Sequence, residues 1–518
     1  MIVEEREQTE LALSMPSPED RLPRLAGLAL TVVVALLIAA LLVKGVASAA
    51  TASEMFFYPF QFDESEGMIV AETMLMDQGV GIFALPTPDL FISAPYPPLF
   101  YLLNWPIQHL SGAEPTFKGG RALSLLSALF VGVAIFGIVS SLTRDRLAGV
   151  VGGLAWWSLS LVTYWGSLVK PDVLAVALGL AGLWWLISRP QTQVWWALPF
   201  FLGAIYTKQT AIAAAVAAVG WLLFTRPRTA LAFGGLYAVS AVVPTLALNW
   251  LTDGGYFYHL FTIHDLPWFE ERYGLFVGNF LATYWPFVLP GTIVLLAMGV
   301  VWLVRRLRKE AQPVPRGAAL LLFFYLGMTI VASVGTGTHG GQHNHLLEWA
   351  ASSCLGLGMG IAMLRRINVW QARVASALAG VLVLAFVPGL FTHPGWMRAE
   401  FGQLDVERRG AMMSIFQYVT NNGGTAYSDN VSLLLTARKK LWTTDPFTQT
   451  HATEFGRWDE SKLVGAISGR SFDQIILRVD VFEPGRISAG DVSPAILQAV
   501  KDNYKLDQGN VENIYVPR

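Results

Sequence analysis

The feature that most limits how this chain can fold is a series of apolar runs, most of them about 17–25 residues long. Runs of this length can cross the hydrocarbon core of a bilayer, which is about 30 Å thick. They predict a mainly α fold, a polytopic membrane helix bundle with about eleven transmembrane helices. The predicted spans cover residues 25–43, 121–142, 147–167, 173–188, 194–207, 209–225, 230–250, 281–304, 317–335, 346–364 and 371–391.

The composition supports this class of protein. Hydrophobic residues make up 53% of the 518 residues and charged residues 14%, against about 25% charged residues in a soluble domain. No basic cluster lies on a soluble face, which argues against a nucleic-acid partner. The single cysteine, Cys354, excludes an internal disulfide. The polar residues 1–24 are expected to form a cytoplasmic tail rather than a cleavable signal peptide.

Loop charges orient the predicted spans. Residues 97–112 are apolar, but they are few and contain prolines, so we expect a helix at the membrane interface rather than a span. The short basic turns then fall on the side of the N-terminus, as the positive-inside rule requires of the cytoplasmic side. Lys44, Lys118 and Arg121 are exceptions on the outer side. The basic turns hold Arg144 and Arg146, Arg189, Arg226 and Arg228, residues 305–316, and Arg365 and Arg366.

The outer side is predicted to carry most of the chemistry. It holds a first loop over 51–120, with two interfacial helices, which belongs to a membrane domain over 25–392. Residues 393–518 are expected to form a small extracytoplasmic α/β domain, and because they contain no Gly-rich phosphate loop, no nucleotide site is expected there. Its strands are predicted over 425–428, 440–443 and 472–479, and its helices over 460–467 and 494–503.

Three carboxylates follow the first predicted span, those of Asp63, Glu64 and Glu66. Acidic groups are expensive to keep close to lipid, which favours a functional role. One of them could act as a general base that takes a proton from an attacking hydroxyl. Repulsion between neighbouring carboxylates can raise the pKa of one of them toward the working range. A solvated acidic loop is the alternative.

The segments after this cluster form a specific combination. Residues 66–79 have the pattern of an amphipathic helix, and YPPLFYLL, 96–103, opens a second surface helix. With Arg121 opening the next span and Asp172 at the outer end of a later one, the sequence resembles the C-type-fold integral-membrane glycosyltransferases that use polyprenyl-phosphate sugars. It looks most like the branch of the protein O-mannosyltransferases and lipid A aminoarabinose transferases. The likeness covers residues 25–250; later segments match only in layout.

The resemblance implies that Asp63 is the catalytic base and that Asp172 helps to build the acceptor or cation site. Glu64, beside Asp63, is the third candidate catalytic carboxylate. A divalent cation (Mg²⁺, Mn²⁺ or Zn²⁺) could bind between Asp63 or Asp172 and the donor phosphate. Aminoarabinose transferases usually carry Glu-Lys just before the Pro-Pro pair, where this chain has Ala94-Pro95-Tyr96. A donor-binding lysine is therefore missing from that position.

Lys170 and Lys208 could contact the donor phosphate instead. Both lie at predicted outer ends of spans, where an ammonium group can meet a phosphate as a point charge. Snorkelling of these side chains to the lipid headgroups is the alternative. Lys170 could also form an internal ion pair with Asp172.

A Gly-rich segment, 335–348, supplies further candidates. Its glycines free the backbone to approach a ligand, and imidazoles and amides can bind phosphate or sugar oxygens. We expect His343 and His345 to contact the donor phosphate, and Asn344 and Glu348 to contact the acceptor or sugar. Metal binding by the two histidines and Glu348, or a flexible loop without a ligand, are the alternatives.

Tyr96 and His264 complete the predicted acceptor or sugar site. His264 lies in an aromatic-rich loop, 253–273. Aromatic rings there can stack on sugars, but they also suit the belt of aromatic residues at a membrane interface.

Together these features predict a membrane glycosyltransferase that moves a monosaccharide from a polyprenyl-phosphate donor to a glycan, lipid or protein acceptor. The reaction would invert the anomeric carbon at the outer face of the cytoplasmic membrane, with Asp63 as base and cations offsetting the charge of the leaving phosphate. A lipid-linked saccharide transporter or flippase is one alternative, although its ionisable groups would lie near the bilayer midplane. A non-catalytic membrane scaffold is the other.

Overall fold

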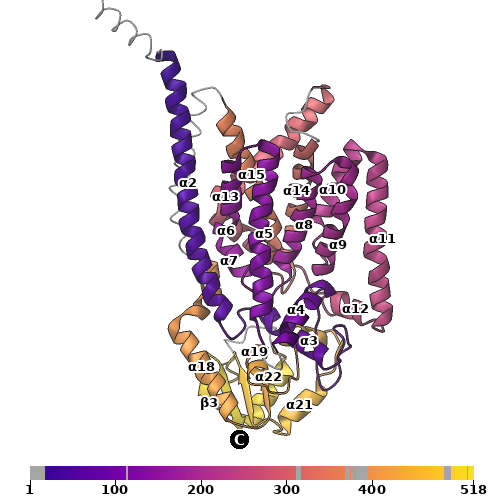
Figure 1. The fold of residues 1–518 in the computed structure, drawn as a ribbon. Helices are drawn as coiled ribbons and strands as arrows, with labels where there is room; N and C mark the ends of the chain where they lie inside the picture. The colour runs from indigo at the N-terminus through magenta and orange to yellow at the C-terminus, as the bar shows by residue number, and fades with distance from the viewer. Residues whose placement is uncertain are drawn as a thin grey trace, which may run out of the picture.

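The structure is a computed structural model that describes residues 18–111, 115–310, 317–367, 395–483, 492–509 and 511–518, together with 374, 377 and 380. It is a helix bundle with a small α/β unit at one end (Figure 1). The predicted mainly α, polytopic fold class is therefore confirmed.

The bundle is built from long and short helices. The long ones are α2 (Pro18–Phe57), α5 (Lys118–Thr143), α11 (Pro227–Leu251), α13 (Glu270–Leu307), α14 (Ala318–Ala332) and α15 (Leu347–Arg366). The shorter ones are α6 (Arg146–Ser158), α7 (Ser160–Trp165), α8 (Asp172–Ser188), α9 (Leu198–Thr207), α10 (Ala213–Thr225) and α12 (Gly255–Phe257), with a π-helical turn η2 (Tyr258–Thr262) and 3₁₀ turns η1 (Gln191–Ala197), η4 (Ser333–Gly337) and η5 (His343–Leu346).

Six of the described helical segments are long and apolar enough to cross a membrane, so the chain is a multi-pass membrane protein. They are Arg24–Phe57, Lys118–Thr143, Pro227–Leu251, Glu270–Leu307, Ala318–Gly337 and His343–Arg366. Helices α8 and α10 are apolar but shorter. The predicted span 147–167 is divided into α6 and α7 where Leu159 adopts an extended backbone. The predicted span 371–391 lies outside the described residues except for 374, 377 and 380. The number eleven therefore stays a prediction.

Helices α13 and α15 pack with their backbones nearly in contact, because glycines face each other between them. A Cβ atom on Gly356 would lie 2.0 Å from the carbonyl oxygen of Gly291, and one on Gly291 would lie 1.8 Å from that of Ser353. Small residues recur on α15 every four positions, at 352, 356 and 360, which is the pattern that lets membrane helices approach closely. This packing fixes the N-terminal end of α15, which carries Glu348.

We expect Gly356→Val to destabilise the protein by about 1–3 kcal/mol or more, because the new side chain overlaps the α13 backbone. Thermal unfolding of the purified protein in detergent measures the effect. Gly327→Val on α14 is the matched control, since a Cβ atom there meets nothing within 4 Å. Equal melting temperatures for the two variants would contradict the close contact.

The first loop contains both helices predicted from its sequence, α3 (Glu64–Asp77) and α4 (Pro98–Leu110). Asp63 is the N-cap of α3, and its carboxylate accepts the backbone N–H of Ser65 at 3.0 Å. Most of α3 is buried, whereas α4 exposes apolar side chains such as Leu103 and Leu110. The cap fixes the Asp63 backbone at the start of a rigid element.

The C-terminal unit is a four-stranded sheet with helices. Its strand order is β1-β2-β4-β3, with β1 and β2 parallel and the other pairs antiparallel. The strands are β1 (Ala426–Ser428), β2 (Gln474–Leu477), β3 (Tyr504–Gly509) and β4 (Asn513–Pro517). The helices are α17 (Arg398–Phe401), α18 (Val406–Asn421), α19 (Val431–Thr436), α20 (Pro446–Glu454), α21 (Ser461–Ser468) and α22 (Pro494–Asn503), with 3₁₀ turns η7 (Gly395–Met397) and η8 (Gly402–Leu404).

The predicted strand over 440–443 is wrong. Instead of joining the sheet, this segment pairs with the first loop: Phe91 donates its N–H to the Trp442 carbonyl at 3.0 Å and accepts the N–H of Thr444 at 2.9 Å. Backbone hydrogen bonds therefore join the first loop to the C-terminal unit. Both lie at the same end of the bundle in Figure 1.

Candidate active site

A cavity of 760 Å³ lies where the bundle, the first loop and the C-terminal unit meet. Eight of the sequence-predicted site residues line it: Asp63, Glu64, Tyr96, Lys170, Lys208, His264, Asn344 and His345. Asp172 and Glu348 line a smaller pocket that shares Lys208, Asn344 and His345 with the cavity. Residues far apart in the sequence thus converge on one site.

Asp63 and Lys170 form a buried ion pair at the cavity wall. The Lys170 Nζ atom lies 2.9 Å from Oδ1 of Asp63, and it also lies 4.5 Å from the centre of the Trp165 ring. Burial alone would raise the pKa of Asp63, but the Lys170 ammonium outweighs it and holds that pKa below its usual value. Carboxylate repulsion could raise the pKa of one carboxylate in the acidic cluster, but the pKa of Asp63 is shifted in the opposite direction because its close neighbour is a cation.

Asp172 is paired with the second lysine. Lys208 forms a short ion pair with Oδ1 of Asp172, and Asn344 donates its amide N–H to the same oxygen at 2.8 Å. Among the described residues, Oδ2 of Asp172 and Oδ1 of Asn344 accept no hydrogen bond. Because both residues line the small pocket, a hydroxyl group placed there would find acceptors. The sequence-based alternative of a Lys170–Asp172 pair is replaced by Lys170–Asp63 and Lys208–Asp172.

Glu64 contacts the C-terminal unit. Arg478, which follows β2, forms a short ion pair with Glu64 and donates Nε to Asp429 at 3.2 Å. The Arg478 and Glu64 side chains are each about one-third exposed, toward the cavity they line. Glu64 therefore connects the start of α3 to the C-terminal sheet.

Tyr96 and His264 are both held in neutral form at the cavity wall. Burial raises the pKa of Tyr96 to about 12, so its hydroxyl can donate a hydrogen bond at neutral pH. Burial lowers the pKa of His264, and its Nδ1 donates to the His259 carbonyl at 2.7 Å. The other ring nitrogen of His264 is then an acceptor. These two groups suit contacts to sugar hydroxyls.

His343 lines neither the cavity nor the small pocket. Its ring stacks on Trp396 with centroids 3.9 Å apart and meets the edge of Phe276 at 4.3 Å. Its neighbour His345 does line the cavity. The alternation follows from the 3₁₀ turn η5, which points successive side chains in different directions.

Several lining residues were missed by the sequence reasoning: Arg272, Arg408, Gln403, Asp445 and Arg478. In total, five lining residues are Lys or Arg and three are Asp or Glu, so the cavity has an excess of cations. Within the described part of the chain, no carboxylate forms an ion pair with Arg272 or Arg408. Arg272 instead donates to the Gly341 carbonyl at 2.7 Å. The sequence signal for Arg272 was its place in the aromatic-rich loop 253–273, whereas no sequence signal marked Arg408 or Arg478.

The helix bundle, the first loop and the C-terminal α/β unit together have the fold of a solved membrane-protein structure. The resemblance seen in the sequence is thus confirmed for the fold.

The particular likeness is to ArnT from Cupriavidus metallidurans. Its structure bound to undecaprenyl phosphate matches with a TM-score of 0.57 at 14% identity, over 91% of this chain and 97% of that chain. The apo state of ArnT matches with a TM-score of 0.56 at the same identity and coverage. The oligosaccharyltransferase of Archaeoglobus fulgidus, apo, gives 0.49 at 10% identity over 92% and 74% of the two chains, which is too weak to argue from. No protein-family model and no curated protein matches the sequence. The reaction must be argued from the site.

Proposed function

We propose that this protein transfers a monosaccharide from a polyprenyl-phosphate donor to an acceptor hydroxyl, with inversion. The observation that carries the proposal is the buried Asp63–Lys170 pair in a cation-rich cavity. The bound undecaprenyl phosphate in ArnT, which has the same fold, supports a polyprenyl-phosphate partner.

The donor phosphate is proposed to bind among Lys208, Arg272 and Lys170. Arg272 is at the start of α13, at the cavity wall, and pairs with no described carboxylate. A planar guanidinium group can hold two phosphate oxygens in a fixed bidentate geometry, whereas a lysine acts as a point charge. Arg272 is therefore our candidate for the role of the lysine that is missing before the Pro-Pro pair.

Asp63 is proposed to act as the base. It takes the proton of the acceptor hydroxyl while that oxygen attacks the anomeric carbon, and the bond from this carbon to the phosphate oxygen breaks. The phosphate leaves with the bonding electron pair, and cations around it offset the developing charge. When Lys170 turns from Asp63 to the donor phosphate, burial raises the pKa of the carboxylate it leaves. Donor binding would thus strengthen the base.

A divalent cation between Asp63 or Asp172 and the donor phosphate fits poorly, because an ammonium group already lies against each carboxylate. Among the described residues, no group of three or more His, Cys, Asp or Glu side chains could hold a metal ion. In the proposed reaction, Lys170, Lys208 and Arg272 offset the charge of the phosphate.

We place the cavity at the outer face of the cytoplasmic membrane. The basic turns gather at the other end of the bundle, where Arg365 in the last turn of α15 contacts Asp145 at 2.7 Å. By the positive-inside rule this end faces the cytoplasm.

A topology measurement checks this placement. In intact cells, an impermeant maleimide should label Ser461→Cys, an exposed position on α21, and spare Ser188→Cys, which is exposed at the basic end. The native thiol, Cys354, is buried. The opposite labelling pattern would place the cavity in the cytoplasm.

The reaction itself is tested in proteoliposomes that contain the purified protein, membrane acceptors and a panel of polyprenyl-phosphate hexoses and pentoses. We expect protein-dependent release of polyprenyl phosphate from one donor, measured by mass spectrometry. If no donor is cleaved while a labelled donor crosses the bilayer intact, the chain is a transporter and the proposal is wrong.

A further inference from the structure

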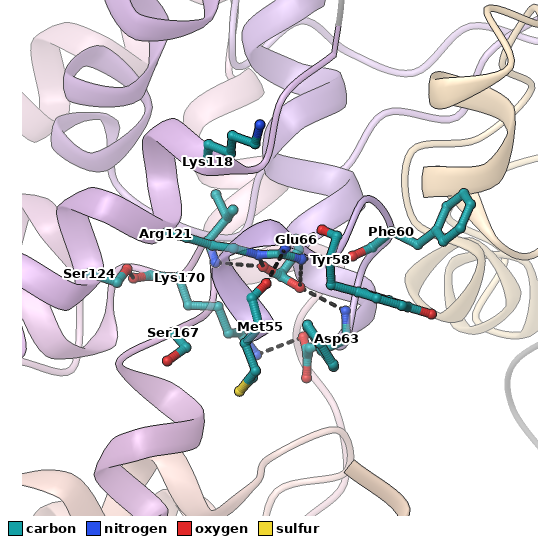
Figure 2. Close-up of polar contacts among 12 residues, drawn as sticks. Met55, Tyr58, Phe60, Asp63, Glu66, Lys118, Arg121, Ser124, Ser167 and Lys170 are labelled. Carbon is teal, nitrogen blue, oxygen red and sulfur yellow. Dashed lines mark hydrogen bonds and ion pairs between the residues drawn. The ribbon is translucent and has the colours of Figure 1, made fainter. Parts of the chain in front are cut away.

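The third carboxylate of the acidic cluster, Glu66, is fully buried and takes no part in the cavity wall. It forms a two-pronged pair with Arg121, which donates Nε to Oε1 at 2.9 Å and Nη2 to Oε2 at 3.1 Å (Figure 2). Neither side chain has any exposed surface. The role of Glu66 therefore differs from the one proposed for Asp63.

Arg121 has no donor left for a substrate. Its remaining N–H groups go to three backbone carbonyls: that of Met55 in the last turn of α2, at 2.7 Å, and those of Tyr58 and Phe60 in the segment before α3, at 2.5 Å and 2.7 Å. With the two bonds to Glu66, all five guanidinium donors are satisfied. Arg121 thus ties the first loop to the start of α5, and it accounts for one of the basic residues on the predicted outer side.

Glu66 accepts two further bonds, both from backbone N–H groups. Oε2 accepts the N–H of Phe62 at 2.7 Å, and Oε1 accepts the N–H of Val169 at 2.8 Å. Phe62 directly precedes Asp63, and Val169 directly precedes Lys170. One carboxylate therefore holds both backbone segments that carry the Asp63–Lys170 pair, although 103 residues separate Glu66 from Val169.

The backbone at Val169 also has to approach α5 closely for this contact. A Cβ atom on Gly120 would lie 2.3 Å from Cγ1 of Val169, so glycine at this position lets the segment pack against the helix beside Arg121. Ser124, one turn further along α5, donates to the Lys170 carbonyl at 3.1 Å. The Lys170 segment is thus fixed from both sides.

From these contacts we infer that Glu66 is a positioning residue, which together with Arg121 sets the distance and orientation between Asp63 and Lys170. The inference rests on the proposed function for its catalytic consequence, but its structural content does not depend on any substrate. A glutamine at position 66 offers only one acceptor oxygen, so it cannot serve both backbone N–H groups and Arg121.

The test compares Glu66→Gln with the matched control Asp145→Asn, which weakens a partly buried Arg365 pair at the other end of the bundle. Asn at 145 can still cap α6, as Asp145 does. Hydrogen exchange followed by mass spectrometry reports on the segments around 62 and 169, and kcat, KM and melting temperature are measured on the same preparations.

We expect Glu66→Gln to speed exchange at both segments together and to lower kcat about 100-fold, with a smaller change in KM, because misplaced reacting groups slow the chemical step. The control should leave the exchange at both segments and kcat unchanged. Faster exchange at only one segment, or at neither, would overturn the positioning role. Faster exchange at both segments with unchanged kcat would overturn it as well, because the contacts of Glu66 would then serve the structure alone and not the reaction.

The double variant Glu66→Gln/Arg121→Gln separates positioning from charge balance. If the only role of Glu66 were to neutralise Arg121, kcat would recover in the double variant, and the inference would fail; we expect it to stay low. If the wild-type protein cleaves no donor, the proposed function fails, while coupled exchange at the two segments still decides whether Glu66 holds them together.

Discussion

Replacing Asp63 by Asn is expected to slow sugar transfer about 10²–10⁴-fold, which is the usual contribution of a general base. Asn cannot take the proton, yet it can still cap α3 by accepting the N–H of Ser65. The fold should therefore survive the change. Initial rates of polyprenyl phosphate release, with melting temperatures beside them, measure the effect.

The control for this variant is Glu64→Gln. Glu64 is one residue away and is also a carboxylate, but it forms an ion pair with Arg478 of the C-terminal unit. We expect less than about a tenfold loss of rate, since the Glu64 carboxylate transfers no proton in the proposed reaction. A folded Asp63→Asn protein with the wild-type rate would remove Asp63 from the mechanism.

The second large effect is expected for Lys170→Gln, about a 100-fold loss of kcat, because one cation near the leaving phosphate disappears. The same change removes the group that holds the pKa of Asp63 below its usual value. Burial then raises that pKa. Because the base works deprotonated, the acid limb of the pH profile of kcat/KM should move to higher pH.

Lys462→Gln is a suitable control, since Lys462 pairs with Asp89 on the surface, about half exposed. It should change neither kcat nor the acid limb. An unmoved acid limb in Lys170→Gln would mean that the titrating base is not Asp63.

The membrane bundle and most of the site could be predicted because their signals are local. Asp63, Lys170 and Lys208 each stand next to the end of an apolar run, where a charged side chain is uncommon. Because Lys170 and Asp172 are two residues apart, opposite charges were expected side by side at the site. Which carboxylate pairs with which lysine could not be predicted. The partners of Asp172 are Asn344 and Lys208, which come from other segments of the chain.

Contacts between residues far apart in the chain could not be predicted from the sequence. Arg478 meets Glu64 across 414 residues, and nothing in its surroundings marks it as a site residue. The three carboxylates at 63–66 look alike in the sequence. Only the contact with the Arg121 guanidinium, 55 residues away, distinguishes the buried positioning residue Glu66 from the candidate base Asp63.

The C-terminal sheet shows the same limit. Strands β1 and β2 are buried throughout and were predicted, whereas β3 is exposed after its first residue and lacks the alternating pattern of a half-buried strand. The segment 440–443 has strand-forming residues, but Thr443 pairs with Phe91 of the first loop instead.

The central claim is that one cavity binds the lipid-linked sugar with its anomeric carbon next to Asp63. Electron cryo-microscopy of Asp63→Asn with a polyprenyl-phosphate sugar tests it most directly. We predict the phosphate among Lys170, Lys208 and Arg272, and the sugar between this group and position 63. A donor bound at any other place, with this cavity unoccupied, would contradict the account.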